Sequence, residues 1–345
     1  MTYEQDLAPV FVIAEAGVNH NGDIGLAMDL VDVAHRAQAD AVKFQTFTTA
    51  AVIAADAPLA DYQKAQSESS ALAMLQSFEL PYSDFERIAE RCGRIGIEFM
   101  SSPFDLDSAA FLAGIGMRRF KIASGELTNE PFVRGVARLA AADPDRSIIL
   151  STGMSTLGEV AETVGWIEDE GCGDLTLLHC VSNYPTPPKD VNLRAMDTLG
   201  AAFGHPVGWS DHTLGDAVSL AAVARGARII EKHFTLSNAL PGPDHHMSMD
   251  PEGLGRLVCG IRAVEACLGD GRKRPVDAER EIMTVARRSL FAAHDLAEGQ
   301  TVTAADFVAL RPGDGLSPAR LKDIVGTRTV SMIPGGAKVG RNQFI

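Results

Sequence analysis

The stretch FVIAEAGVN (residues 11–19) is a short apolar run that ends in polar residues, as expected of a buried strand that leads into a loop. Seven further runs of similar length follow it along the chain. They are AVKFQTF (41–47), IEFMSSPF (97–104), RRFKIASGE (118–126), SIILSTGM (147–154), LTLLHCVSNYP (175–185), PVGWSDHT (206–213) and RIIEKHFT (228–235). Eight such runs predict eight parallel strands, the number that closes a barrel.

The segments between these runs are longer and carry apolar residues at spacings of three and four, which indicates amphipathic helices. Examples are IGLAMDLVDVAHRAQ (24–38), PYSDFERIAERCGRIG (81–96), STLGEVAETVGWIEDEG (155–171) and LGDAVSLAAVARGA (214–227). Strands alternating with helices over about 250 residues favour an α/β protein with a (β/α)8 TIM barrel. An open doubly wound sheet is the alternative, but no GxGxxG motif follows the first run, which weakens a dinucleotide-binding interpretation.

The composition changes after the last helical segment, and this change predicts the domain organisation. Residues 1–272 are expected to form the barrel. Residues 273–288 are charged and are broken by proline, as is typical of a linker. Short strand-like pieces separated by Gly/Pro turns predict a small β-rich domain over residues 289–345.

The charge and cysteine content exclude several classes of function. A formal net charge of −14 argues against nucleic-acid binding, which requires a basic surface to displace counterions. The first residues lack a basic segment, so they do not resemble a signal peptide, and no apolar stretch is long enough to span a membrane. Five cysteines without CxxC spacing indicate reduced thiols. The sequence therefore predicts a cytoplasmic protein.

Polar residues end nearly every predicted strand, and active sites of TIM barrels lie at the carboxyl ends of the strands. Taken singly, most such residues only cap loops. The polar residues at these ends are Glu15, Asn19, His20, Lys43, Gln45, Ser101, Ser102, Lys121, Ser124, Glu126, Ser151, His179, Ser182, Ser210, Asp211, His212, Glu231, Lys232 and His233. So many together predict a functional site.

His212 and His233 end consecutive strands, and neighbouring strands lie roughly 4.8 Å apart, so both imidazoles could bind one divalent ion. Either histidine alone would more often be a packed core residue. Two histidines with a carboxylate would suit Mn²⁺, Mg²⁺, Co²⁺ or Zn²⁺. Cys180 is expected to be a buried thiol that faces away from this site.

Lys43 and Lys121 lie among apolar neighbours, where an unpaired ammonium group is costly. Each must therefore pair with an anion or form a Schiff base, and a structural salt bridge is the simplest alternative. Hydroxyls at the strand ends would complete a cradle for a phosphate and a carboxylate. These hydroxyls belong to Ser102, Ser124, Ser151 and Ser210.

The segment LSNALPGPDHHMSMDP (236–251) is rich in proline and glycine and follows the eighth run, so it is expected to shape the mouth of a pocket. Asp244 is the substrate-binding candidate in this loop. His245 and His246 are expected to face solvent.

Ten motifs occur in an order that makes the chain recognisable. They are IAEAGVNHNGD (13–23), KFQT (43–46), SSPFD (101–105), KIASGE (121–126), LSTGM (150–154), HCVSNYPTP (179–187), GWSDHT (208–213), EKHFT (231–235), PGPDH (241–245) and RPGDG (311–315). Together they resemble the N-acetylneuraminate synthase family, and the last lies in a segment similar to the antifreeze-like (SAF) domain. The resemblance spans nearly the whole chain.

This resemblance implies that phosphoenolpyruvate condenses with the aldehyde of an N-acyl amino sugar, either N-acetylmannosamine or a 2,4-diacetamido-2,4,6-trideoxy-mannose relative. The products would be a nonulosonic acid and phosphate. It also implies a domain-swapped homodimer, in which the SAF domain of one subunit covers the site of the other and Arg311 reaches the partner's sugar.

The resemblance assigns roles residue by residue. Mn²⁺ or Mg²⁺ would be bound by His212 and His233, with Glu15 close to the metal-bound water. Glu15, Glu126 and Lys121 would be catalytic. The phosphoenolpyruvate-binding set would be Lys43, Ser102, Lys121, Ser124, Ser151, Ser182 and Ser210. The sugar-binding set would be Gln45, Glu126, Tyr184, Asp244 and Arg311.

Two positions differ from the sialate-forming pattern, in which threonine stands at Ser102 and asparagine at Ser182. The motif HCVSNYPTP is similar to that of enzymes that make legionaminic-type acids. Two competing functions are a pyruvate aldolase that forms a Schiff base on Lys121 or Lys43, and a non-catalytic carbohydrate-binding protein.

Overall fold

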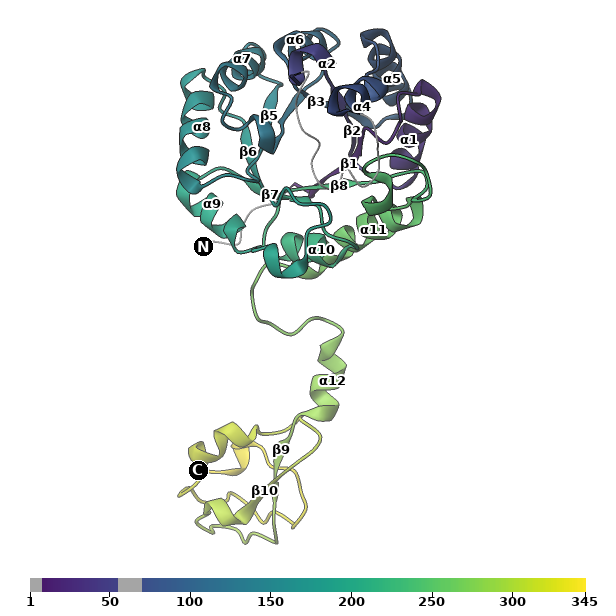
Figure 1. Ribbon diagram of the computed structural model, residues 1–345. Helices are drawn as coiled ribbons and strands as arrows, with labels where there is room; N and C mark the ends of the chain where they lie inside the picture. The colour runs from purple at the N-terminus through teal and green to yellow at the C-terminus, as the bar shows by residue number, and fades with distance from the viewer. Residues whose placement is uncertain (1–7, 55–69) are drawn as a thin grey trace. The chain divides into compact units, whose positions relative to one another are not determined.

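The computed structural model describes residues 8–54 and 70–345. Internal contacts divide the chain into two compact units, Met1–Asp270 and Gly271–Ile345. In the first unit, eight parallel strands close into a barrel in sequence order, which confirms the predicted TIM barrel. Figure 1 shows the strands in the middle of this unit, with the helices around them.

The strands are shorter than the apolar runs that predict them, because several runs continue into the loops that follow. The strands are β1 (Phe11–Gly17), β2 (Ala41–Thr46), β3 (Glu98–Pro103), β4 (Arg119–Ile122), β5 (Ser147–Ser151), β6 (Leu175–Cys180), β7 (Val207–Asp211) and β8 (Ile229–His233). The predicted run 175–185 therefore ends as a strand at Cys180, and Ser182 and Tyr184 lie in the next loop.

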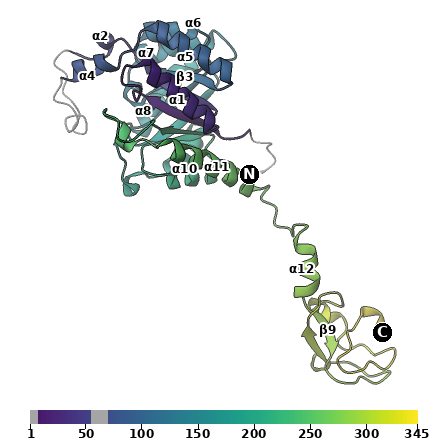
Figure 2. The ribbon, with the colours of Figure 1, turned by 90° about the vertical axis from the view of Figure 1, so that its right-hand side faces the viewer.

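A helix follows each strand and covers the outside of the barrel. The helices are α1 (Ile24–Arg36), α2 (Thr49–Val52), α4 (Ala71–Phe78), α5 (Tyr82–Ile95), α6 (Leu106–Gly114), α7 (Glu130–Ala141), α8 (Leu157–Asp169), α9 (Ala195–Phe203), α10 (Ala217–Ala224) and α11 (Pro251–Leu268). Figure 2 shows α10 and α11 side by side on the outside of the wall. None of the helices in the described part of the chain is long and apolar enough to cross a membrane.

Local sequence signals start these helices at defined residues. The Asp23 side chain accepts hydrogen bonds from the first backbone amides of α1, and Asp250 caps α11 in the same way. At α8, Thr156 and Glu159 form a reciprocal capping box. Each cap satisfies amides that have no partner within the helix, so each fixes where a strand-to-helix loop ends.

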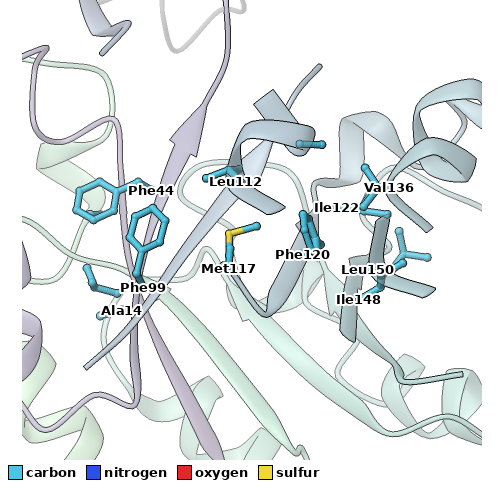
Figure 3. Packing of buried hydrophobic residues seen from close by; sticks show 14 of the residues in the cluster. Ala14, Phe44, Phe99, Leu112, Met117, Phe120, Ile122, Val136, Ile148 and Leu150 are labelled. Atoms are coloured by element: carbon cyan, nitrogen blue, oxygen red, sulfur yellow. The ribbon is translucent and has the colours of Figure 1, made fainter. Parts of the chain in front are cut away.

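Successive residues of a strand point to opposite faces, and in this barrel one face meets the helices and the other meets the interior. Figure 3 shows the helix-facing side, where Phe120 and Ile122 of β4 and Ile148 and Leu150 of β5 lie in one cluster with Val136 of α7. Each fully buried side chain of this size stabilises the fold by about 1.5–3 kcal/mol. The predicted helical periodicity therefore buries the outer face of the sheet.

The interior of the barrel contains a layer of apolar side chains from six of the strands. They are Ile13, Ala41, Met100, Ile149, Leu178 and Ile229. The residue two positions later on each strand points the same way and lies nearer the carboxyl end. This alternation selects the residues that can line a site above the apolar layer.

The pairing of β1 with β8 closes the barrel, with Glu15 opposite His233 in register. The loop after β1 and the loop after β8 therefore start next to each other, although more than 200 residues separate them.

The second unit, Gly271–Ile345, contains helix α12 (Glu279–Ala286) and an antiparallel pair, β9 (Ser289–Ala292) and β10 (Phe307–Leu310). Helix α12 lies within the segment expected to be a linker. The core of this unit consists of buried aliphatic side chains and one phenylalanine. They are Leu290, Ala292, Leu296, Val302, Ile324, Ile333, Val339 and Phe344.

Candidate active site

A cavity of about 170 Å³ lies at the carboxyl ends of the barrel strands. All eight strands, or the loops that directly follow them, contribute to its wall. The polar and sulfur-bearing lining residues are Glu15, Lys43, Gln45, Ser102, Lys121, Ser124, Ser151, Met154, Cys180, Ser182, Tyr184, Ser210, His212, Glu231 and His233. The structure therefore brings together twelve of the fifteen site residues expected from the sequence.

Strand alternation explains which polar residues reach this cavity. Lys43 follows Ala41 by two positions, and Glu231 follows Ile229 in the same way, so both lie directly above the apolar layer. Lys232, the residue between Glu231 and His233, points outward and forms an ion pair with Asp211 at 3.1 Å. The polar side chains at the strand ends thus fall into two groups, those that line the cavity and those that face the helices and form ion pairs there.

Four buried charged side chains form one network in the cavity floor. Lys43 Nζ lies 2.7 Å from a Glu15 oxygen and 3.6 Å from a Glu231 oxygen. Lys121 Nζ lies 3.7 Å from the other Glu231 oxygen. All four side chains are at most 4% exposed. Their formal charges cancel, so an incoming dianion would have to replace carboxylates as the partner of the two ammonium groups.

The two carboxyl groups of this network, Glu15 and Glu231, have pKa values shifted in opposite directions. Burial raises the pKa of Glu15 to about 7, although Lys43 opposes this shift. Burial also works against the ionised form of Glu231, but Lys121 and Lys43 outweigh it and lower the pKa to about 2. Two carboxylates that share cations commonly divide in this way. Glu15 is therefore poised to exchange a proton near neutral pH.

The pKa values of Lys43 and Lys121 shift in opposite directions. Burial works against the charge of Lys43, but the Glu15 and Glu231 carboxylates outweigh it and raise its pKa. Burial lowers the pKa of Lys121, and Glu231 offsets only part of this effect. Lys43 is thus a permanent cation, whereas Lys121 depends on an anion beside it.

Hydroxyl groups surround the charged network. Ser102 accepts a hydrogen bond from Lys43 at 3.0 Å, and Ser210 donates one to Glu231 at 2.9 Å. The Ser151 hydroxyl is buried without a hydrogen-bond partner among the described residues. A buried donor of this kind costs free energy unless a ligand or water satisfies it, so Ser151 supports an anion-binding role for this cavity.

Gly153 allows the hydroxyls of Ser124 and Ser182 to approach the backbone. Its amide donates a hydrogen bond to Ser124 Oγ at 3.0 Å. A Cβ atom at this position would lie 2.3 Å from Ser182 Oγ and 2.8 Å from Ser124 Oγ. Only glycine leaves room for both predicted phosphoenolpyruvate ligands at this corner of the cavity.

The two histidines predicted to bind metal converge at the cavity wall. The Tyr184 hydroxyl is hydrogen-bonded to Nε2 of His212, and it lies 3.0 Å from Nε2 of His233. Nδ1 of His212 lies 2.7 Å from the Val181 carbonyl oxygen, so it carries the proton, and Nε2 presents its lone pair to the cavity. A backbone carbonyl on the second ring nitrogen is the usual arrangement for a metal-binding histidine.

The protonation of this pair also bears on a metal. Burial lowers the pKa of His233 well below its usual range, with His212 adding to this effect, so His233 is neutral and able to coordinate. Burial opposes the charge of His212 as well, but Cys180 and the Val181 carbonyl raise its pKa. No group of three or more His, Cys, Asp or Glu side chains in the described ranges is arranged to hold an ion. Two imidazoles could hold a divalent ion only together with ligands from substrate or water.

Three predicted site residues lie outside the cavity lining. Glu126 is in a short turn after β4, where it accepts a hydrogen bond from Asn129 at 2.8 Å. Asp244 is half-buried in the loop after β8, and burial raises its pKa to about 6 while His212 opposes the shift. Arg311 is exposed in the second unit.

The structure corrects two expectations and adds one residue. Cys180 is buried, but it lines the cavity and places Sγ 3.7 Å from Nδ1 of His212, so it does not face away. His245 is fully buried, whereas His246 is exposed as expected. Glu231 is a charged cavity residue for which the sequence predicts no role, and its separation of two residues from His233 is the signal that places it on the same strand face.

Two family models and several known proteins match this chain. The family model for the NeuB family matches residues 30–273, and that for the SAF domain matches residues 287–337. N,N'-diacetyllegionaminic acid synthase of Legionella pneumophila is 45% identical over 332 residues, which cover 94% of this chain and 92% of that protein. The protein of the same name from Campylobacter jejuni is 41% identical, over 91% of this chain and 94% of its own.

A solved structure is similar as well. The crystal structure of N-acetylneuraminic acid (sialic acid) synthetase from Leptospira borgpetersenii, in complex with citrate, superposes with a TM-score of 0.70 at 34% identity. The match covers 80% of this chain and 90% of that chain.

Proposed function

The chain belongs to the NeuB family, and on this premise we propose that it condenses phosphoenolpyruvate with an N-acyl amino sugar to give a nonulosonic acid and phosphate. The observation that carries the proposal is the pair of buried lysines, Lys43 and Lys121, among serine hydroxyls at the carboxyl end of the barrel. A substrate with a phosphate and a carboxylate matches two cations and several hydroxyl donors.

The charged network provides the anion site. Lys43 and Lys121 would turn from Glu231 toward the phosphate and the carboxylate of phosphoenolpyruvate. The hydroxyls of the surrounding serines would donate to the same oxygens, and the unsatisfied Ser151 hydroxyl would gain a partner. The remaining serines of this set are Ser102, Ser124, Ser182 and Ser210.

His212 and His233 would hold the divalent ion, Mn²⁺ or Mg²⁺, and the Tyr184 hydroxyl would leave the point between them. When bound there, the ion supplies Lewis-acid polarisation of the sugar aldehyde. The neutral imidazole of His233 and the Nε2 lone pair of His212 are the features of this chain that favour such binding.

We propose the following reaction at this site. C3 of phosphoenolpyruvate attacks the aldehyde carbon, so a carbon–carbon bond forms and the aldehyde oxygen takes up a proton. Water then adds to the cation at C2, and Glu15 accepts the proton of that water as general base. The adduct collapses to the C2 ketone as the C2–O bond to phosphate breaks and the proton of the C2 hydroxyl passes to the departing phosphate, which the lysine ammonium groups stabilise. Glu126 is less suited as the base, because it does not line the cavity.

The sugar that we assign is a 2,4-diacetamido-2,4,6-trideoxy-mannose relative, which would give a legionaminic-type acid. Two relatives at 45% and 41% identity are named N,N'-diacetyllegionaminic acid synthases, and this supports the choice over N-acetylmannosamine. Gln45, Tyr184 and Asp244 lie at or beside the cavity, where they would bind the sugar hydroxyls and acyl groups.

Phosphate release tests the reaction directly. Purified protein is expected to release phosphate from phosphoenolpyruvate only with the diacetamido sugar, to stop when treated with a chelator, and to recover when Mn²⁺ is added. N-acetylmannosamine is the matched control sugar. Turnover of N-acetylmannosamine alone would reassign the sugar, and chelator-resistant turnover would contradict the metal. No release with any aldehyde would reject the synthase.

The second candidate is a Schiff-base aldolase on Lys121, which the lowered pKa of this lysine favours because a neutral amine is the nucleophile. Borohydride with pyruvate would trap a covalent adduct on Lys121 of an aldolase, and it would leave the synthase unmodified. A non-catalytic carbohydrate-binding protein would give neither phosphate nor adduct.

The proposal includes a domain-swapped homodimer. The second unit contains the SAF domain and exposes Val308 and Leu310 on β10, directly before Arg311. Exposed apolar side chains that lie together are typical of a surface that contacts another chain. In such a dimer, Arg311 would contact the acyl group of the partner's sugar.

Mixing two inactive variants tests the swap. His233→Ala removes a barrel residue and Arg311→Ala removes a residue of the second unit, so each homodimer should be impaired. After co-expression, mixed dimers should contain one intact site each and recover about a quarter of wild-type phosphate release. Failure of the mixture to exceed the sum of the separate variants would show that each site is completed within one chain.

A further inference from the structure

His245 is a buried polar residue that the proposed reaction does not use. It is fully buried, although its neighbour His246 is exposed. It directly follows Asp244, the proposed sugar-binding residue, in the loop between β8 and α11. Burial lowers the pKa of His245, so the ring is neutral and must satisfy one donor and one acceptor nitrogen.

Both ring nitrogens of His245 are hydrogen-bonded, and the network assigns their roles. Asn21 Nδ2 donates to the Pro241 carbonyl at 2.8 Å, so Asn21 Oδ1 faces Nε2 of His245 at 3.2 Å. The Oδ1 atom can only accept, so Nε2 carries the proton. Nδ1 is then the unprotonated nitrogen, and it lies 2.6 Å from the Thr235 hydroxyl. His245 therefore connects the end of β8 to the loop after β1.

A second chain of hydrogen bonds holds the same segment. Asn19 Nδ2 donates to the Phe234 carbonyl at 2.7 Å and to Ser248 Oγ at 3.0 Å. The Ser248 hydroxyl in turn donates to the backbone carbonyl of Asp244 at 2.7 Å. Asn19 and Asn21 both belong to the loop after β1, which lies beside the loop after β8 because β1 pairs with β8. Two independent connections thus fix the backbone at Asp244.

Gly242 shows how closely the two loops approach. A Cβ atom at this position would lie 2.8 Å from the His245 ring and 2.9 Å from Asn21 Oδ1, and its φ of +142° disfavours other residues. The segment PGPDH therefore packs directly on the Asn21 amide. The Asp244 carboxylate interacts electrostatically with two residues of the cavity wall. Burial raises the pKa of Asp244 and His212 lowers it in part, while Asp244 adds to the raised pKa of the Tyr184 phenol.

We propose that His245 is a positioning residue for the sugar substrate, because it fastens the 241–245 segment to Asn21 and so keeps the Asp244 carboxylate near His212 and Tyr184 of the cavity wall. The proposal rests on the proposed synthase function for the identity of the ligand. It does not involve phosphoenolpyruvate, whose lysines and serines lie on other strands and in the loops that follow them.

Steady-state phosphate release with His245→Ala tests this role, with His246→Ala as the matched control one residue away. His245→Ala is expected to raise KM for the sugar by about 10- to 100-fold, since a displacement of about 1 Å has effects of this size. KM for phosphoenolpyruvate should change by less than about twofold, because the anion site is separate. His245→Gln, which retains a donor at the position of Nε2, should recover most of the loss, and His246→Ala should match the wild type.

A double variant distinguishes positioning of Asp244 from a purely structural role of His245. In an Asp244→Ala background, His245→Ala should raise KM for the sugar no further, because the residue acts through Asp244. An equal rise of both KM values, or an unchanged His245→Ala enzyme, would overturn the proposal. If His245→Ala fails to fold, Asn21→Gly removes the same connection at a positive-φ position that glycine accepts, and the same outcomes apply.

Hydrogen exchange makes the test independent of the reaction. Exchange of backbone amides in residues 236–248 should rise in His245→Ala and remain at the wild-type level in His246→Ala. If wild-type protein releases no phosphate with any sugar, the proposed function fails, and the exchange data still decide whether His245 fastens the loop. Unchanged exchange in His245→Ala would reject the positioning role.

Discussion

Glu15→Gln is expected to lower kcat for phosphate release by about 10²- to 10⁴-fold, the range that general-base catalysis contributes. Glu15 is buried in the cavity with Lys43 at 2.7 Å, and its pKa of about 7 suits a base that exchanges a proton near neutral pH. Glutamine has nearly the same shape as glutamate, but its amide cannot act as a general base. Glu126→Gln is the matched control, because Glu126 lies outside the cavity lining, and its kcat should stay near the wild-type value.

The role of Glu15 as a base also predicts how kcat/KM depends on pH. Glu15 must be ionised to accept a proton, so wild-type kcat/KM should rise as the pH increases through about 7 and then level off. Glu15→Gln should lose this rising limb. An unchanged limb in Glu15→Gln, with a loss of activity in Glu126→Gln, would transfer the role of base to Glu126.

The same raised pKa has a consequence for stability. A folded-state pKa above the usual 4.5 means that the folded chain holds this proton more tightly than the unfolded chain. The stabilising contribution of protonated Glu15 is therefore complete below about 4.5 and is lost as the pH rises to about 7. Urea unfolding across this interval should show a smaller loss of stability in Glu15→Gln than in the wild type.

Lys43→Met is expected to lower kcat/KM for phosphoenolpyruvate by at least about 10²- to 10³-fold, because it removes a preorganised cation from the anion site. The free energy of unfolding should also fall by about 3–5 kcal/mol, since Glu15 and Glu231 would be left buried without this partner. Both changes are measurable on one preparation, by steady-state phosphate release and by urea unfolding.

Lys232→Met separates the two effects of Lys43→Met. Lys232 is another buried lysine with a carboxylate partner, Asp211, but it faces the helices. The Lys232→Met variant should lose a comparable amount of unfolding free energy and keep the wild-type KM for phosphoenolpyruvate. If both variants impaired kcat/KM equally, the loss in Lys43→Met would reflect folding, and the role of Lys43 in binding the anion would be rejected.

The sequence was sufficient for the barrel because the fold depends on a repeated pattern. Eight apolar runs and the amphipathic segments between them define which elements form, and caps such as Asp23 and Thr156 define where helices begin. Parallel strands joined by helices place all carboxyl ends at one edge, so the gathering of polar strand ends into one site also follows from the sequence. His212, His233, Lys43 and the serines were found in this way.

Only the tertiary structure decided which polar residues enter the cavity and what charge they carry. Glu126 does not line the cavity, because the chain leaves β4 at Ile122 and enters a short turn, which strand periodicity does not report. His245 is buried because barrel closure places the loop after β8 against the loop after β1, over 200 residues away in the chain. The separated pKa values of Glu15 and Glu231 depend on distances to the same two lysines. Periodicity is a local property of the chain, whereas burial and electrostatic interactions depend on which distant residues the fold brings together.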